Sequence, residues 1–218
     1  MASIAGAHNQ RVADARELRT PKGRKAQQRF AFEGPTLLEE ATRSGAQILE
    51  LFVTRAVYDS NPLVREAETG GSSVFIVDDR TAQRLSDVDS PTGLVAVAPL
   101  AYAPLDRALA VRRCLILAEL NDPGNAGTLM RSAEAFGAQA VIFGAGGVEP
   151  YHPKVIRAAM GAAFRLALAV ATPQEASEAA AATGAELVGL DAQGEDIRSL
   201  RPADRLAIVV GHERRGLG

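Results

Sequence analysis

Residues 121–131 read N-D-P-G-N-A-G-T-L-M-R, and this stretch decides the expected fold of the second half of the chain. An apolar run at 114–120 precedes it, a helical pattern over 126–136 follows it, and another apolar run occupies 139–143. Strand, Pro/Gly/Asn-rich turn, helix and strand in this order predict a βαβ unit. In open α/β sheets ligands bind outside the carboxyl ends of the strands, which is where this loop would lie.

The helix expected over 126–136 presents two unlike faces. At about 100° per residue, Arg131 lies nearly opposite the apolar stripe, and Gly127 lies one turn earlier on the same outer face as Arg131. The stripe that we expect to face the sheet is Ala126, Leu129, Met130, Ala133 and Phe136. Asn125 is placed to cap the helix. Helix geometry alone favours a solvated surface arginine at 131, since such arginines are common.

Composition narrows the class of protein. The chain has 218 residues, of which 47% are hydrophobic, enough for one large or two modest packed domains. No apolar run approaches the roughly 18 residues of a membrane span, and the N-terminus is too polar for a signal peptide. The single cysteine, Cys114, lies in an apolar run, so we expect a buried side chain and a cytoplasmic protein. His8, His152 and His212 are widely spaced and predict no metal site.

Positive charge is concentrated near the N-terminus. The chain carries a formal net charge of −2, but residues 11–29 hold seven Lys or Arg against two acidic residues, a local charge of +5. Such a segment on an acidic protein is compatible with phosphate binding. Charge alone leaves a solvated helix and loop equally open.

Pattern divides the chain into a domain at 1–98, a Pro-containing linker at 99–112 and a second domain at 113–218. In the first domain we expect helices at 12–18, 34–44, 62–68 and 81–85, a helix break at 20–23, and strands at 29–33, 48–53, 73–77 and 93–98. In the second we expect strands at 114–120, 139–143, 165–171, 186–190 and 206–210, and helices at 126–136, 153–163, 173–182 and 197–200. This alternation predicts two α/β domains, the second with a parallel sheet covered on both faces.

Two further loops follow expected strands at the same edge as 121–131. The loop from Gly211 is polar and flanked by glycines, and 190–194 reads L-D-A-Q-G. Glycines at such positions allow the backbone to approach a ligand closely. The run G-A-G-G at 144–147 lacks the G-x-G-x-x-G spacing, which argues against a nicotinamide dinucleotide.

Three ordered segments resemble the SpoU family of RNA 2′-O-ribose methyltransferases. Asn125, Gly127 and Arg131 follow D-P-G in the pattern N-x-G-x-x-x-R of its first motif. Residues 211–217, G-H-E-R-R-G-L, resemble its second motif, and 156–166, I-R-A-A-M-G-A-A-F-R-L, match a segment between the two. The basic stretch up to 35 and the stretch 91–97 resemble the family's N-terminal RNA-binding domain, so the similarity covers most of the chain.

The resemblance implies a C-terminal α/β domain of the trefoil-knot (SPOUT) type, a small N-terminal α/β RNA-binding domain and a homodimer. It implies S-adenosylmethionine as cofactor and structured RNA, ribosomal RNA above all, as substrate. The implied catalytic residues are Arg131, Asn125 and Glu213. The implied cofactor-binding residues are Leu190, Asp191, Ala192, Gly211 and Glu213. The implied RNA-binding residues are Arg19, Lys22, Arg24, Lys25, Arg29 and Arg157.

Two departures from the family pattern bear on these expectations. His212 and Arg214 stand where the family usually has Asn and Gly. The family's third motif, which completes the cofactor pocket, would follow Gly218, and we expect the native protein to continue there. An RNA-binding homologue without activity, a transfer-RNA methyltransferase and an antibiotic-resistance role stay open. Because a guanidinium has a pKa above about 12, we expect Arg131 to orient and stabilise the developing alkoxide rather than act as a base.

Overall fold

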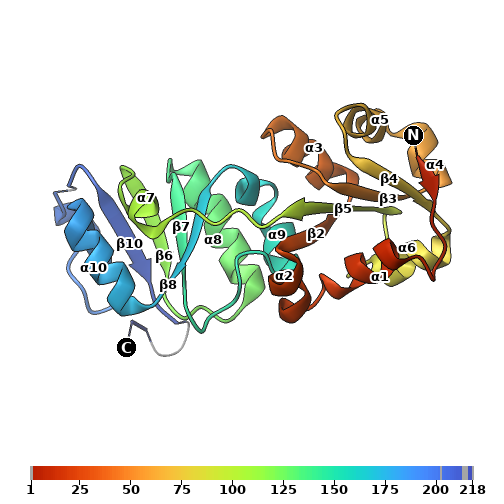
Figure 1. Ribbon diagram of the computed structural model, residues 1–218. Coiled ribbons are helices and arrows are strands. Elements are labelled where there is room, and N and C mark those ends of the chain that lie inside the picture. The colour runs from red at the N-terminus through yellow and green to blue at the C-terminus, as the bar shows by residue number, and fades with distance from the viewer. Residues whose placement is uncertain (1, 202, 213–215, 218) are drawn as a thin grey trace. The chain divides into compact units, whose positions relative to one another are not determined.

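The computed structural model describes residues 2–201, 203–212, 216 and 217. The chain forms two compact units, Met1–Leu100 (unit 1) and Ala101–Gly218 (unit 2). Figure 1 shows each unit as a sheet with helices on both faces. No helix in the part of the chain that the structure describes combines the length and apolar character needed to cross a membrane.

Unit 1 contains a five-stranded mixed sheet in the order β1-β4-β3-β5-β2. β1, β4 and β3 pair in parallel, whereas β5 is antiparallel to both β3 and β2. Its strands are β1 (Ser3–Ile4), β2 (Arg29–Glu33), β3 (Glu50–Thr54), β4 (Ser73–Val77) and β5 (Leu94–Pro99). Its helices are α1 (Gln10–Glu17), α2 (Pro21–Gln27), α3 (Pro35–Arg43), α4 (Arg55–Ser60), α5 (Pro62–Thr69) and α6 (Asp79–Leu85).

Helices α1 and α6 cover one face of this sheet, and α3 and α5 lie on the other (Figure 1). On the α1 side, Val12, Ala15 and Leu18 pack against Phe52 and Val97 of the sheet in one buried cluster. Side chains of β2 alternate between the two faces of the sheet. Phe30 and Phe32 are buried on one face, and the partly exposed Arg29, Ala31 and Glu33 lie on the other.

The helix break expected at 20–23 is right in that α1 ends at Glu17, but a second helix, α2, begins at Pro21. Thr20 caps the helix by accepting a hydrogen bond from the backbone N–H of Gly23 at 3.0 Å, and Pro21 occupies the first helical position. Proline is well suited to that position because the N–H it lacks would have no partner within the helix. The segment T-P-K-G therefore starts a helix, which carries Lys22, Arg24 and Lys25.

Unit 2 contains a five-stranded sheet in the order β8-β7-β6-β10-β9, and every pair in it is parallel. Its strands are β6 (Arg113–Leu117), β7 (Ala140–Gly144), β8 (Ala167–Ala171), β9 (Glu186–Gly189) and β10 (Leu206–Val210). Its helices are α7 (Leu105–Leu109), α8 (Pro123–Ala135), α9 (Pro153–Ala159) and α10 (Pro173–Thr183), with 3-10 turns η1 (Ala162–Phe164) and η2 (Ile197–Ser199).

Successive side chains of β6 point to opposite faces of the sheet and therefore face different helices. Cys114 and Ile116 join a buried cluster with Ala108 of α7 and Ala176 of α10. Helices α8 and α9 pack against each other, and α8 contacts β6. The segment expected as a linker thus contains α7, whose Ala108 and Leu109 are fully buried within unit 2.

A buried tyrosine fastens the beginning of unit 2. The Tyr151 hydroxyl donates to the carbonyl of Ala101 at 2.8 Å and accepts from its N–H at 3.2 Å. The ring also packs edge-on against Tyr102, with the ring centroids 5.2 Å apart. Burial raises the pKa of Tyr151 to about 12, although the hydrogen bond to Ala101 acts in the opposite direction. Burial likewise raises the pKa of the Cys114 thiol to about 12.

These two groups predict a loss of stability in alkaline solution. Both groups are neutral when protonated, and both have raised pKa values in the folded state. Their contribution to the free energy of unfolding is therefore fully present below their unfolded pKa values of about 9 and 10, and it is lost as the pH rises through about 12. For Tyr151 the loss amounts to about 2–3 kcal/mol. Tyr151→Phe should therefore flatten the dependence of unfolding free energy on pH between pH 10 and 12, measured by urea unfolding. Parallel curves for wild type and variant would contradict this assignment.

Candidate active site

The order of strands in unit 2 reverses between β6 and β10. The chain proceeds from β6 outward through β7 to β8, and then β9 and β10 form the other side of β6. Since all five strands are parallel, their carboxyl ends share one edge of the sheet. Ligands of open α/β sheets bind at that edge, next to such a reversal point. The loops after β6 and β10, which begin at residues 118 and 211, are the two that flank it.

The loop after β6 leads directly into α8, and Asp122 caps this helix. Its Oδ1 accepts a hydrogen bond from the backbone N–H of Asn125 at 2.7 Å, and Pro123 occupies the first helical position. The expectation that Asn125 is the cap is therefore wrong, because Asn125 lies inside the first turn. Its side chain remains exposed beside the reversal point.

The two faces predicted for this helix are partly wrong. Ala126 and Met130 are fully buried, as expected of the sheet-facing stripe, but Phe136 is 88% exposed at the end of α8. Gly127 does not lie on an open face. A Cβ placed on it would lie 2.5 Å from both the Cβ of Ala158 and the carbonyl oxygen of Val155, so α9 packs directly against its backbone.

Segments 122–134 and 154–165 run side by side in the same direction. Asp122 and Lys154 are 3.9 Å apart at their start, Gly127 meets Ala158 in the middle, and Glu134 forms a bidentate ion pair with Arg165 at their end. The sequence segments 121–131 and 156–166 thus belong to one substructure. Glu134, on which the sequence offered no signal, ties its far end.

Arg131 lies on α8 between the Gly127 and Glu134 contacts. Its side chain is exposed and forms no hydrogen bond or ion pair with any other residue that the structure describes. Of the other two arginines of this substructure, Arg165 is occupied by Glu134 and Arg157 is half-buried on α9. An arginine whose five N–H donors are available can bind an oxyanion or hold a hydroxyl group.

The glycine run 144–147 has a structural role in this site. A Cβ on Gly144 would lie 2.7 Å from the backbone nitrogen of Glu119, and one on Gly147 would lie 2.8 Å from the carbonyl oxygen of Leu120. The N–H of Val148 also donates to that carbonyl at 2.8 Å. The loop after β7 therefore braces the loop after β6, backbone against backbone, which only glycine permits.

The loops after β9 and β10 meet on the other side of the reversal point. The Leu190 N–H donates to the carbonyl of Val209 at 2.9 Å, and the side chain of Leu217 lies against Gly189. His212 and Gly216 exchange two backbone hydrogen bonds of 2.8 and 2.9 Å, which close the loop after β10. A Cβ on Gly211 would lie 2.3 Å from the carbonyl of Gly216, so that closure depends on glycine at 211.

A cavity of about 760 Å³ lies along β9 and the segment 190–201 that follows it. Of the residues expected to bind the cofactor, Leu190 and Asp191 line it, Gly211 lies at the end of the neighbouring strand, and Ala192 is exposed outside it. The volume and the mixture of Leu190, Ile197 and Leu200 with Asp191 and Ser199 suit a nucleoside-sized ligand. Glu213, expected in both the catalytic and cofactor sets, lies outside the described residues.

The residues expected to bind RNA differ in their accessibility. Lys22 and Lys25 are exposed on α2, and Arg19 is exposed with a 3.6 Å ion pair to Asp87. Arg24 is only 2% exposed, and its guanidinium donates to the carbonyl of Leu18 at 2.9 Å, so the structure contradicts an RNA contact there. Arg29 is a third exposed and faces Glu50. Arg157 is half-buried on α9 in unit 2.

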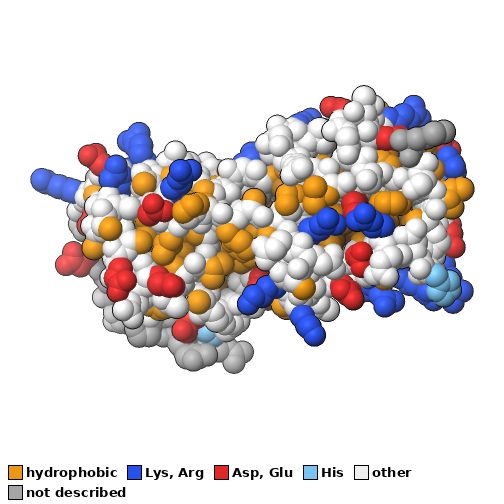
Figure 2. Space-filling model, in the orientation of Figure 1, with side chains coloured by type: hydrophobic (Ala, Val, Ile, Leu, Met, Phe, Trp, Pro, Cys, Tyr) orange, Lys and Arg blue, Asp and Glu red, His pale blue; other side chains and the backbone are white. Residues whose placement is uncertain are grey.

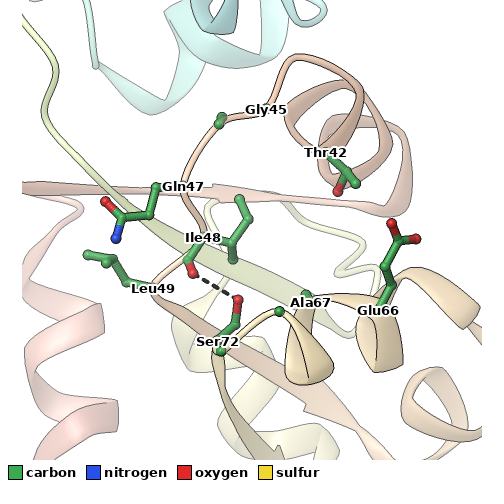
Figure 3. A pocket seen from close by; sticks show the side chains of 11 residues that line it. Thr42, Gly45, Gln47, Ile48, Leu49, Glu66, Ala67 and Ser72 are labelled. Carbon is green, nitrogen blue, oxygen red and sulfur yellow. Dashed lines mark hydrogen bonds between the residues drawn. The ribbon is translucent and has the colours of Figure 1, made fainter.

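Unit 1 also contains a hollow of about 390 Å³ at the amino ends of β3 and β4 (Figure 3). Thr42 and Glu66 lie on the two helices that face each other across it, and the Ser72 hydroxyl donates to the carbonyl of Ile48 at 2.8 Å. Among its lining residues, all of them described, there is a carboxylate but no Lys or Arg. This hollow is therefore unsuited to a phosphate group. Nor do the described residues contain a cluster of His, Cys, Asp or Glu able to hold a metal ion.

Comparisons with known proteins agree with this geometry. Residues 112–218 match the SpoU rRNA Methylase family, and residues 9–96 match the MRM3-like substrate binding domain. The chain is 28% identical over its whole length to the 23S rRNA (guanosine(2553)-2′-O)-methyltransferase RlmP of Bacillus subtilis and covers 85% of that protein. It is 31% identical over 149 residues, 66% of the chain, to human mitochondrial rRNA methyltransferase 3, of which it spans 35%.

The fold matches a solved structure closely. The crystal structure of AdoMet-bound rRNA methyltransferase from Sinorhizobium meliloti has a TM-score of 0.87 at 25% identity, covering 99% of this chain and 83% of that one. The chain thus belongs to the SpoU rRNA methylase family and joins its catalytic domain to an MRM3-like domain. This confirms the expected family and its α/β fold class.

Proposed function

We propose that this protein transfers a methyl group from S-adenosylmethionine to a ribose 2′-hydroxyl of ribosomal RNA. The observation that carries the proposal is the exposed guanidinium of Arg131 on α8, the helix that begins at the reversal point of the unit 2 sheet. This guanidinium has no hydrogen bond or ion pair to the residues that the structure describes. The cofactor and the substrate class are those named for the relatives described above.

Unit 2 supplies the groups that this reaction needs. When bound, S-adenosylmethionine supplies an electrophilic methyl group, and the cavity lined by Leu190 and Asp191 would hold its nucleoside part. Arg131 would donate hydrogen bonds to the ribose oxygen and stabilise the negative charge that develops as the hydroxyl proton leaves to water. Asn125, one and a half turns earlier on α8, would orient the ribose. We retain Glu213 as a proposed member of the site.

We further propose that the protein acts as a homodimer in the cytoplasm. A largely apolar hollow of about 250 Å³ lies between α8 and β10, lined by Leu129, Ala133 and Phe136 on the helix and by Ile208 and Val210 on the strand. Exposed apolar surface of this kind is typical of subunit contacts. Light scattering of the purified protein measures whether it is dimeric.

Methyl transfer to defined RNAs tests the proposed activity. The full-length protein is incubated with methyl-labelled S-adenosylmethionine and in vitro transcripts of 23S rRNA, 16S rRNA or transfer RNA, and nucleosides are then analysed by mass spectrometry. We expect a 2′-O-methylated nucleoside in a ribosomal transcript. Label in transfer RNA alone would replace the proposed substrate. Protein that binds the transcripts but never the cofactor would favour a non-catalytic RNA-binding protein.

A further inference from the structure

Two arginine side chains of unit 1 meet at one buried carboxylate. Glu50 is the first residue of β3, and its side chain is only 7% exposed. Arg11 of α1 donates from Nη1 to Glu50 Oε1 at 2.9 Å, and Nη1 of Arg29 lies 3.5 Å from the same oxygen. The cluster therefore draws on a helix and two strands that are up to 39 residues apart in the chain.

The register of the sheet explains why these residues meet. β5 lies between β2 and β3, with Arg29 opposite Pro99 and Glu50 opposite Val97. Val97 belongs to the cluster that packs beneath Val12 of α1. Glu50 and Arg29 thus emerge on the face that α1 covers, where Arg11 completes the group.

The balance of charge in this cluster is uneven. A buried carboxylate is costly unless it is paired, and Glu50 has the two partners that it needs. Two guanidinium groups and one carboxylate leave a formal charge of +1. The side chain of Arg11 is 53% exposed and that of Arg29 is 33% exposed, and neither has a second acidic partner among the described residues. Each arginine carries five N–H donors, so most of them stay available to an external anion.

Arg43, on the other face of the unit 1 sheet, is paired differently from Arg11 and Arg29. Arg43 on α3 pairs with Glu39 at 2.6 Å and with Glu40 at 3.7 Å, both at the surface, so its charge is fully compensated. On the face that Figure 2 presents, Lys and Arg side chains of unit 1 alternate with acidic ones instead of forming a continuous basic patch. A guanidinium pair held by a buried carboxylate is therefore a distinct feature of this surface.

We propose that Arg11 and Arg29, held in place by Glu50, form a binding site for a backbone phosphate of the substrate RNA. Arginine suits this task because its planar fork of donors matches the geometry of phosphate oxygens. Glu50 acts as a positioning residue that fixes both forks and does not itself contact RNA. The inference rests on the proposed function, since it takes the substrate to be RNA.

Binding of a 23S rRNA transcript by the full-length protein tests the site. Arg11→Ala and Arg29→Ala should each weaken binding about tenfold, as expected for loss of one charged hydrogen bond. Each should also reduce the slope of log affinity against log salt by about 1. Arg43→Ala removes the same charge from the opposite face of the sheet and is the matched control. Equal effects of all three variants would overturn the proposal.

Glu50→Gln separates positioning from charge. The substitution makes the protein more positive, so charge alone predicts tighter RNA binding, whereas loss of positioning predicts binding several-fold weaker, of the order of one charged hydrogen bond. Unchanged or tighter binding by a variant with normal thermal unfolding would overturn the role of Glu50. If this variant does not fold, Arg29→Lys decides, because it keeps the charge but loses the fork; binding equal to wild type would then contradict the proposal.

Methyl transfer by the wild-type protein is measured in parallel. Absence of methyl transfer by the wild-type protein would contradict the proposed function. Normal methyl transfer, combined with unchanged RNA binding by the arginine variants, would contradict only the phosphate site proposed here.

Discussion

Replacing Arg131 by alanine is expected to reduce the rate of methyl transfer to RNA by about 10²–10³-fold, the usual effect of removing one donor that stabilises a developing oxyanion. The reason is that its side chain is exposed on α8, the helix that begins at the reversal point, and has no hydrogen bond or ion pair to the described residues. Since no described partner depends on it, the variant should fold normally. Single-turnover transfer at saturating RNA and cofactor, together with thermal unfolding, measures both effects.

Two further variants make this test specific. Arg131→Lys keeps the charge but loses the planar fork, so we expect an intermediate rate. Arg112→Ala removes another exposed arginine, next to the amino end of β6 and hence at the opposite edge of the sheet, and should leave the rate unchanged. An Arg131→Ala protein with wild-type transfer would exclude this arginine from the chemistry.

Alternation at 29–33 and apolar runs at 73–77 and 206–210 predict three strands to the residue. The strands expected at 29–33, 73–77 and 206–210 coincide with β2, β4 and β10. The run 114–120 was expected to be strand throughout, but β6 ends at Leu117. Leu120 is apolar because it is buried in the following loop, where Gly147 packs on its backbone. An apolar residue in the sequence indicates that its side chain is buried. It does not show whether that residue belongs to a strand or to a loop that another loop covers.

Proline explains two of the errors at helix starts. The interpretation of 20–23 as a break alone misses α2, and that of Asn125 as a cap misplaces the start of α8, because Pro21 and Pro123 both occupy the first position of a helix. The preceding residues, Thr20 and Asp122, then cap those helices. The preference of proline for this position could have identified both caps from the sequence.

Tertiary contacts explain what local pattern could not predict. Arg24 is one of seven basic residues between 11 and 29, and only the fold reveals that its guanidinium is buried on the carbonyl of Leu18. Glu50 lies far from the basic segment in sequence, so its ion pairs depend on the register of β3 beside β5. The spacing of family-like motifs identifies the segments around Asn125, Arg131 and Gly211. It does not predict which other side chains contact these segments and hold them in place.

Gly127→Ala is expected to lower both the stability and the activity of the protein, because α8 and α9 cannot keep their present separation. The added Cβ would lie 2.5 Å from the carbonyl oxygen of Val155 and 2.9 Å from the backbone nitrogen of Ala159. Backbone atoms cannot rotate away as a flexible side chain can, so one helix must shift. Overpacking of this kind costs about 1–3 kcal/mol, and we expect the upper end of that range. The midpoint of thermal unfolding should fall by roughly 10 °C.

The same shift should reach the proposed active site. Gly127 lies between Asn125 and Arg131 on α8, so a displacement of the helix by a fraction of an ångström moves both side chains relative to the loop after β10. We expect methyl transfer to fall at least tenfold even at temperatures where the variant is fully folded, since misplacing catalytic groups by about 1 Å can cost 10²-fold. Gly6→Ala is the control, because a Cβ there meets nothing within 4 Å. A Gly127→Ala protein with unchanged melting temperature and transfer rate would show that the two helices can separate without moving Arg131, and would leave Arg131 positioned by the contacts at Glu134 instead.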